Sequence, residues 1–415
     1  MREFTTKGTH FQLNGQIIAL RGDVNCAVFP LTGYPAMDLS WWKKLFKIYK
    51  LWGLNAVRFH SWCPPEAAFE AADEVGVYLE PEVDEWSHYK TLRQDSFFRE
   101  ESMLMLNKYG NHPSFVMMAL GNELDADSSL LYHLIDSWEQ TDNRRVYTGE
   151  IAGHPVLDNF QFYNTGRYKG LALRYHSGPV GGWPPPPGSS LFNVLPPETT
   201  LDYHQAVNAY PKPLITHELG QRCSYPDVLH ELPKYKGFLK ATYLDIARDQ
   251  LTERGMLSQV PDFVRASGKW QIQLYKEEIE ANMRTPGIAG FNLLSLEDFP
   301  GQSSAPVGFL DVFYDNKGYI KPEAFRRFCS SRVILAKMPK RILEQNENFN
   351  ADLLMYNFAE TPFRVPDFDC VITDTQGKVV WSKTLPGKVY PIGNGFPIGS
   401  LSLNLSSFKV PAKYN

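Results

Sequence analysis

The chain has 415 residues, of which 43% are hydrophobic and 21% charged, a composition typical of a folded globular protein and not of a disordered one. Its formal net charge is −4, so basic residues are not in excess, which argues against nucleic acid as the main partner. A chain of this length fits one large domain followed by a small one.

The cysteines and the apolar runs narrow the class of protein further. The five cysteines are scattered without a CxxC pair, so neither a disulfide framework nor a cysteine-based zinc site is expected to hold the fold together. Residues 1–12 are polar and contain no signal-peptide core, and no run of about 18 apolar residues follows. The sequence therefore indicates no export signal and no membrane partner. A periplasmic or extracellular location stays open if the chain is a piece of a longer exported protein.

Short β-rich runs alternate with amphipathic helical runs over most of the chain, which predicts an α/β fold with parallel strands. We expect strands at residues 17–21, 56–60, 77–81, 115–120, 145–148, 214–216 and 289–294, with another, the sixth in order, within 170–176. We expect helices near residues 38–51, 65–75, 95–109 and 128–140. Eight strands favour a closed (β/α)₈ TIM barrel. No GxGxxG motif follows the first strand, so no dinucleotide is indicated, and we expect no cofactor.

The pattern changes near residue 340. Short alternating runs at residues 351–356, 369–373 and 378–381 predict a small all-β, immunoglobulin-like sandwich. We therefore expect a catalytic TIM barrel over residues 1–335 and a β-sandwich over residues 340–415. The sandwich shows fewer than the expected strands, which suggests that it is truncated.

Two apolar strands end in a glutamate. The run Phe115–Leu120 leads into Gly-Asn-Glu, ending at Glu123, and the run Leu214–Thr216 leads into His217 and Glu218. A glutamate at a strand end can also cap a helix or pair with an arginine. That alternative weakens here, because the fourth and seventh strands of a barrel face each other across its mouth. Cleavage of a glycosidic bond needs such a pair, one carboxyl protonated and the other ionised.

Three sequence features resemble the catalytic part of glycoside hydrolase family two, the β-galactosidases, β-glucuronidases and β-mannosidases. They are residues 11–15 with 20–25, residues 55–58 with 73–80, and residues 111–114 through 122–123. The resemblance covers about residues 10–330. It implies that Glu123 is the acid/base, that Glu218 is the nucleophile of a retaining mechanism, and that Asn122 bonds the sugar 2-hydroxyl. It also implies that Arg58 holds Glu218 ionised; the alternative for Arg58 is a strand-end arginine facing the surface.

The chain departs from the family pattern around the sugar. His60 is displaced by one position, and Met118 and Leu294 stand where the family usually has tryptophan. These changes leave the reaction class in place and the identity of the sugar open.

Further candidates surround the two glutamates. We expect His60, His217, Glu297 and the loop residue Trp183 to bind substrate, each with a purely structural role as the alternative, which for Glu297 is helix capping. The acidic residues Glu80, Glu82, Asp84 and Glu85 are expected to form a solvated rim in preference to a calcium or magnesium site. Zinc bound by His60, His176 and His217 is disfavoured because no paired spacing supports it, so no metal is expected.

The sequence thus predicts a retaining exo-β-glycosidase that removes a terminal sugar from an oligo- or polysaccharide, with β-galactosidase as the leading activity. A β-glucuronidase would need a cationic clamp, for which residues 167–169 (Arg-Tyr-Lys) are the candidate. A non-catalytic carbohydrate-binding barrel and a transglycosidase stay open as alternatives. The expected partner is carbohydrate, and the oligomeric state is not indicated.

Overall fold

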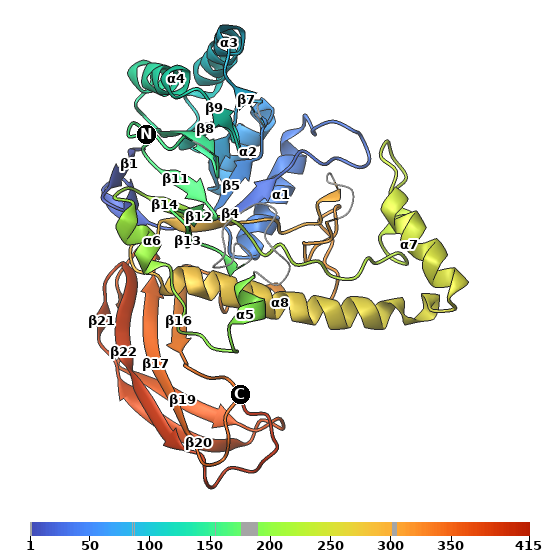
Figure 1. Ribbon diagram of the computed structural model, residues 1–415, viewed down its shortest axis with the longest axis vertical. Coiled ribbons are helices and arrows are strands. Elements are labelled where there is room, and N and C mark those ends of the chain that lie inside the picture. The colour runs from blue at the N-terminus through green and yellow to red at the C-terminus, as the bar shows by residue number, and fades with distance from the viewer. Residues whose placement is uncertain (1, 85, 87, 154, 176–189, 301–304) are drawn as a thin grey trace.

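The computed structural model describes residues 2–84, 86, 88–153, 155–175, 190–300 and 305–415 (Figure 1). Most of the chain forms a parallel sheet flanked by helices, and the C-terminal residues form long antiparallel strands beside it. Within the described residues, no helix combines the length and the apolar character that crossing a membrane requires.

The parallel sheet has eight strands. They are β4 (Leu20–Asn25), β5 (Ala56–Phe59), β6 (Tyr78–Pro81), β8 (Met117–Asn122), β10 (Val146–Ile151), β11 (Tyr163–Thr165), β14 (Leu214–Leu219) and β15 (Gly290–Leu293). Each strand pairs with its sequence neighbours among these eight, and β15 returns to pair with β4. The edge strands β6 and β8 meet through two parallel bridges, Leu79 to Phe115 and Glu82 to Ala119. The sheet is therefore curled, and the predicted α/β class with parallel strands is confirmed.

Two of the expected strands were placed wrongly. The sixth strand is β11 (Tyr163–Thr165), whereas the segment expected to contain it holds only β13 (Leu171–Ala172), which pairs antiparallel with β12 (Arg167–Tyr168). The three residues of β11 are all buried, but two of them are polar, so no apolar run marks the strand. The strand expected at residues 17–21 overlaps the end of β3 (Gln16–Ile18) and only the first two residues of β4, so its bounds are wrong.

A small antiparallel sheet precedes the parallel one. It consists of β1 (Phe4–Lys7), β2 (His10–Leu13) and β3. The first strand of the parallel sheet is β4, all six residues of which are buried, including Arg21, Asp23 and Asn25. Charged side chains in a buried strand conceal it from a hydrophobicity pattern, and such side chains need a partner or a function.

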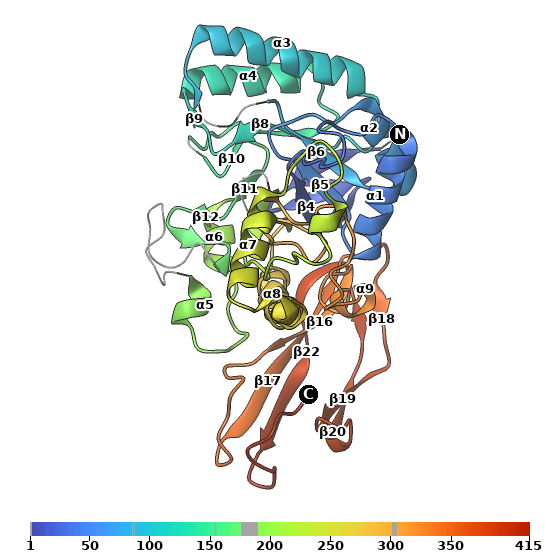
Figure 2. The ribbon, with the colours of Figure 1, turned by 90° about the vertical axis from the view of Figure 1, so that its right-hand side faces the viewer.

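Helices lie between most successive strands of the parallel sheet, although the described residues between β10 and β11 contain none (Figures 1 and 2). The helices are α1 (Leu39–Leu51), α2 (Glu66–Val75), α3 (Leu92–Tyr109), α4 (Ser128–Thr141), α5 (Leu191–Val194), α6 (His204–Ala209), α7 (Thr242–Glu253), α8 (Val260–Arg284) and α9 (Pro322–Phe325). Local chemistry fixes several ends: Asp38 caps α1 through the Trp41 amide, Thr91 and Gln94 form a capping box on α3, and Gly76 ends α2 in the left-handed conformation.

The C-terminal strands build a separate antiparallel arrangement. Strand β17 (Asn348–Asn357) pairs with β16 (Arg332–Lys337) on one side and β22 (Gly393–Asn404) on the other. Two further pairs are β19 (Asp367–Thr373) with β20 (Val379–Pro386), and β18 (Phe363–Arg364) with β21 (Val389–Tyr390). Met355, Tyr390 and Leu401 lie in the apolar cluster of this part. The short strands β7 (His88–Tyr89) and β9 (Asp125–Ala126) pair beside the parallel sheet.

Candidate active site

The two glutamates singled out by the sequence share an uncommon backbone conformation. Glu123 directly follows β8 with φ 50°, and Glu218 lies in β14 with φ 52°. Residues other than glycine rarely adopt the left-handed region, and such residues cluster where a fold aims a side chain for function. In β14 the pairing with β15 shifts register between Thr216 and Leu219, which locally turns the strand at Glu218.

Glu218 is buried, and its two carboxylate oxygens have different partners. His217 Nε2 lies 2.9 Å from Oε1, and Arg58 Nη1 lies 3.7 Å from the same atom. Gln221 donates from Nε2 to Oε2 at 2.8 Å, and Arg174 Nη1 lies 3.5 Å from Oε2. Burial acts to raise the pKa of Glu218, but His217, Arg174 and Arg58 outweigh it and hold the pKa well below its usual range. Glu218 is therefore ionised at neutral pH.

Arg58 organises this cluster from β5. Its side chain is fully buried, pairs with Glu82 through Nε, and donates from Nη2 to Asn122 Oδ1 at 2.8 Å. Its Nη1 lies 2.9 Å from His217 Nε2. The bond from Arg58 holds the Asn122 side chain with its oxygen toward the guanidinium, so that the amide nitrogen faces away from Arg58. One guanidinium thus orients a carboxylate, an amide and an imidazole at once.

His217 is neutral, because burial and the adjacent Arg58 and Arg174 outweigh Glu218 and lower its pKa to about 3. A neutral ring nitrogen cannot donate and accept at the same time. His217 Nε2 has both the Glu218 carboxylate and the Arg58 guanidinium at 2.9 Å, so it either donates a proton to Glu218 or accepts one from Arg58, while Nδ1 lies 3.5 Å from Arg174 Nη1.

Glu123 has the opposite electrostatic environment. Glu123 is exposed as a residue, but its surroundings partly desolvate the carboxyl group. This desolvation, and then the charge of Glu218, raise its pKa against a hydrogen bond from Trp86 that lowers it. Arg174 and Arg58 lower it further, without reversing the net upward shift. The two glutamates are thus shifted in opposite directions, the pattern by which one carboxyl stays protonated beside an ionised one.

Sequence reasoning missed Arg174 and Trp86. Arg174 is 8% exposed and donates from Nη1 to the His217 carbonyl oxygen at 2.9 Å. Gly166 makes room for it, since a Cβ there would lie 2.3 Å from Arg174 Nε. A charged residue between Leu173 and Tyr175 was the available signal for Arg174. Trp86 was hidden by the acidic residues around it.

A carboxylate on α8 positions the segments that carry Glu218 and Arg174. Glu278 is buried and accepts from the Gly220 amide at 2.6 Å and from the Tyr175 amide at 3.0 Å. The Tyr175 amide directly follows Arg174, and the Gly220 amide lies two residues after Glu218. A single helix residue therefore fixes the spacing between the nucleophile candidate and the second arginine.

The remaining predicted site residues lie at different depths. His60 follows β5, and its ring packs edge-on against Trp86 with centroids 4.8 Å apart, beside Glu123. Glu297 is 6% exposed and accepts from the Tyr314 hydroxyl at 3.2 Å. The described residues from Glu297 to Phe299 belong to no helix, so nothing there supports helix capping by Glu297. The neighbouring Asp298 forms a buried ion pair with Lys317. Trp183 lies outside the described residues.

The expectation of a solvated acidic rim after the third strand is wrong for two of its members. Glu80 is 1% and Glu82 0% exposed, while Asp84 is exposed. Glu82 pairs with Arg58, whereas burial raises the pKa of Glu80 to about 8 against the pull of Arg58, so Glu80 is protonated at neutral pH. In the part of the chain that the structure describes, no group of three or more His, Cys, Asp or Glu side chains could hold a metal ion.

Comparisons with known proteins place this geometry in context. A family model described as a domain of unknown function (DUF8488) matches residues 347–415. A β-galactosidase of Staphylococcus xylosus is 30% identical over 142 residues, which cover 30% of this chain and 14% of that protein. A putative β-glucuronidase of Formosa agariphila is 26% identical over 167 residues, which cover 38% of this chain and 16% of that protein.

Solved structures share the fold at low sequence identity. The β-glucuronidase of Parabacteroides merdae aligns with a TM-score of 0.55 and 15% identity, covering 94% of this chain and 49% of its own. A β-galacturonidase of glycoside hydrolase family two from Eisenbergiella tayi aligns with a TM-score of 0.53 and 16% identity, covering 79% and 54%. The chain thus spans about half of each solved structure. The predicted resemblance to family two glycoside hydrolases is confirmed.

Proposed function

We propose that this chain is the catalytic part of a retaining exo-β-glycosidase, with Glu218 as nucleophile and Glu123 as acid/base. The observation that carries the proposal is the opposite shift of two neighbouring glutamates, one held ionised by two arginines and the other with a raised pKa. Similarity to a β-galactosidase and to β-glucuronidases supports the same reaction class.

The proposed reaction has two steps. Glu218 attacks the anomeric carbon while Glu123 donates its proton to the glycosidic oxygen, so that the glycosidic bond breaks and an alcohol leaves. The sugar is then an ester of Glu218, which removes the negative charge that had raised the pKa of Glu123. Glu123 next takes a proton from water, and the oxygen of that water displaces Glu218. The sugar leaves with its original anomeric configuration.

Four neighbouring side chains have proposed roles, three toward the substrate and one toward Glu218. Asn122, held by Arg58, presents its amide nitrogen to the sugar 2-hydroxyl, and that hydrogen bond strengthens in the transition state. His217 stays neutral and orients the Glu218 carboxylate. His60 and Trp86 form the aromatic side of the cleft next to Glu123.

A closed (β/α)₈ barrel and an immunoglobulin-like sandwich form the proposed scaffold, divided near residues 335–340. The two bridges between β6 and β8 support closure of the sheet. The antiparallel pairs from β16 to β22 support the sandwich.

The leading substrate is a terminal β-galactoside, and a β-uronide is the second candidate. The second candidate is favoured by the names of several relatives and by Arg174, a cation within 3.5 Å of Glu218 that a sugar carboxylate could approach. Aryl β-glycosides (galactoside, glucuronide, galacturonide, mannoside and glucoside) test both. We expect turnover of one class.

The catalytic residues are tested with Glu218→Ala and Glu123→Ala on the substrate that is turned over. Loss of the nucleophile is expected to lower kcat by roughly 10⁴-fold or more, and loss of the acid/base by about 10²–10⁴-fold. Glu66→Ala, at an exposed surface glutamate, is the control and keeps full activity. Undiminished turnover by Glu218→Ala contradicts the nucleophile assignment.

Sugar binding without turnover by the unaltered chain supports the non-catalytic alternative, and transfer to added sugar acceptors supports a transglycosidase.

A further inference from the structure

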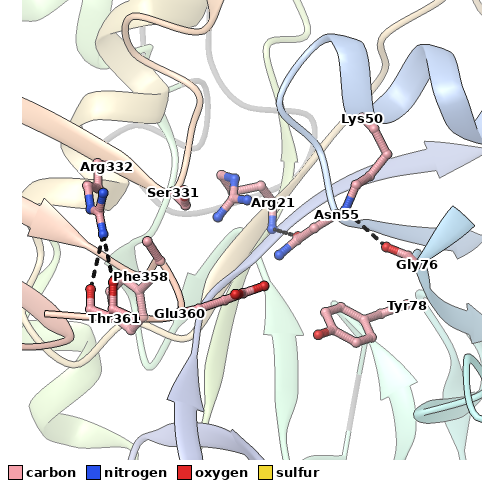
Figure 3. Close-up of a pocket in the computed structure, with 11 residues that line it drawn as sticks. Arg21, Lys50, Asn55, Gly76, Tyr78, Ser331, Arg332, Phe358, Glu360 and Thr361 are labelled. Atoms are coloured by element: carbon pink, nitrogen blue, oxygen red, sulfur yellow. Dashed lines mark hydrogen bonds between the residues drawn. The ribbon is translucent and has the colours of Figure 1, made fainter.

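A pocket lies near the N-terminal ends of strands β4 and β6 (Figure 3), whereas Glu123 and Glu218 lie at the C-terminal ends of β8 and β14. It has a volume of about 440 Å³ and is lined from two sides of the molecule. Arg21, near the start of β4, and Tyr78, the first residue of β6, come from the parallel sheet, and Lys50 comes from α1. Arg332 and Glu360 come from the C-terminal strand region (Figure 3).

The charges that line this pocket are unbalanced. Arg21, Lys50 and Arg332 are cations, and Glu360 is the one carboxylate among the described lining residues, so the pocket carries a net charge of 3 − 1 = +2. Among the ion pairs within 4.0 Å in the described part of the chain, none includes any of these three cations. Lys50 and Arg332 are exposed, whereas Arg21 is buried. Like charges grouped in this way repel one another, so an anion placed between them lowers their electrostatic energy.

Arg21 is the most buried of the three cations, with 8% of its surface exposed. Its Nε donates to the Gly53 carbonyl oxygen at 2.8 Å, which anchors the guanidinium to the turn after α1. Gly53 has φ 90° and lies against the Cys329 carbonyl, which a Cβ would approach to 1.9 Å. Arg21 is therefore held where the turn after α1 packs against the segment that leads into β16.

The other two cations are also positioned. Arg332 donates from Nε to Asn357 Oδ1 at 3.0 Å and from Nη2 to the Thr361 carbonyl oxygen at 3.1 Å, and it lies over the Phe363 ring. Lys50 donates from Nζ to the Gly76 carbonyl oxygen at 3.1 Å. Burial, followed by the charge of Arg21, lowers the pKa of Lys50, and the opposing charge of Glu360 does not offset this shift.

We propose that this pocket binds an oxyanion group of the carboxylate, sulfate or phosphate type, which joins Arg21 of β4 and Lys50 of α1 to Arg332 of β16. Guanidinium groups match the paired oxygens of such anions, and a lysine adds a point charge. Since the side chains are fixed in advance, little conformational entropy is lost on binding. The anion is either free in solution or the acidic substituent of a sugar.

The test measures thermal unfolding of the full chain with inorganic phosphate, inorganic sulfate, glucuronate or glucose 6-sulfate. Sodium chloride of equal ionic strength serves as the baseline. We expect a saturable rise in Tm of a few degrees, because a ligand that binds only the folded state stabilises it. If an inorganic anion saturates at the lower concentration, the ligand is a free anion. If a sugar acid does so, it is a sugar substituent.

Variants link the rise in Tm to the pocket without touching the buried Arg21. Lys50→Gln is expected to weaken anion binding by about five- to tenfold, the loss of one charged hydrogen bond. Glu360→Gln is expected to tighten it, because the change removes the only carboxylate on the described lining. Lys47→Gln, at an exposed lysine on the same helix that does not line this pocket, is the matched control.

Three outcomes would overturn the proposal. They are no saturable rise in Tm with any of the four anions, equal loss in Lys47→Gln and Lys50→Gln, and weaker binding in Glu360→Gln. Because the readout is unfolding and not turnover, the result is independent of the proposed glycosidase activity.

Discussion

Two pairs of carboxyl groups lie in or just after strands of the same sheet and differ in how they are ionised. Glu123 and Glu218 follow or end the strands β8 and β14, with Arg58 and Arg174 beside them. The second pair joins Asp23 of β4 to Glu297, which follows β15. In the first pair one carboxyl is ionised, whereas burial raises the pKa of both carboxyls of the second pair.

The second pair has no arginine or lysine among the causes that set its pKa values. Burial raises the pKa of Asp23 to about 7, and burial together with Asp23 raises that of Glu297 well above its usual range. Asp23 Oδ2 and Glu297 Oε2 find no hydrogen-bond donor among the described groups, so one proton between them satisfies both oxygens. Buried carboxyl groups of the same kind therefore differ in charge according to the cations packed beside them.

The largest effect is expected from removing the cation that distinguishes the two pairs. Arg58→Met leaves Glu82 and Glu218 buried without their shared guanidinium, and breaking a buried ion pair in this way costs about 3–5 kcal/mol. Urea unfolding measures the loss. Arg99→Gln, at a partly exposed pair with Asp95, is the control and should cost less than about 1 kcal/mol. Equal losses in both variants would contradict the organising role of Arg58.

Removing the second arginine tests the ionisation of Glu218 by kinetics. Arg174→Gln is expected to raise the pKa of Glu218 and to lower kcat/KM by roughly 10–100-fold. The acid limb of the pH–rate profile should move to higher pH, because Glu218 is then protonated over a wider range. A lower kcat/KM with an unmoved acid limb would assign Arg174 to substrate binding instead.

The carboxyl pair without a cation is expected to set a pH dependence of stability. Asp23 has a raised pKa in the folded chain, so its stabilising contribution is complete below its unfolded pKa of about 4 and is lost as pH rises to about 7. This loss amounts to at most about 1.4 kcal/mol of unfolding free energy per pH unit, and Asp23→Asn removes it because asparagine does not titrate. Asparagine can still accept from the Leu296 amide, as Asp23 Oδ1 does at 2.7 Å. Unfolding free energies between pH 4 and pH 8 should thus fall less steeply in the variant than in the unaltered chain.

The smallest effect concerns the acid/base itself. Trp86 donates a hydrogen bond that lowers the pKa of Glu123, so Trp86→Phe should raise that pKa and move the alkaline limb of kcat/KM upward by roughly half a pH unit. Tyr34→Phe, at another exposed aromatic residue, should leave the profile in place. A downward movement in Trp86→Phe would show that the indole favours the protonated carboxyl.

Long, strongly patterned elements could be predicted from the sequence. The apolar run before Glu123 and the helix from Asp38 to Leu51 are where the pattern placed them, because hydrophobic periodicity and capping residues act locally. The strands β4 and β11 could not be placed correctly, since buried polar residues interrupt their hydrophobic pattern, and those of β4 have partners far away in the chain. The same reason explains the wrong expectation for Glu80 and Glu82.

The sequence by itself determined the α/β class, the resemblance to a glycosidase family and the two glutamates at strand ends. Each of these features follows from residues that are close together in the chain. What only the tertiary structure decided was the charge of each carboxyl group. Arg58, Arg174 and Glu278 come from β5, a turn after β13 and α8, and their distances to Glu218 and its neighbours depend on how the sheet curls. Ionisation follows from burial and from charges within a few ångströms, and neither is a property of neighbouring letters in a chain.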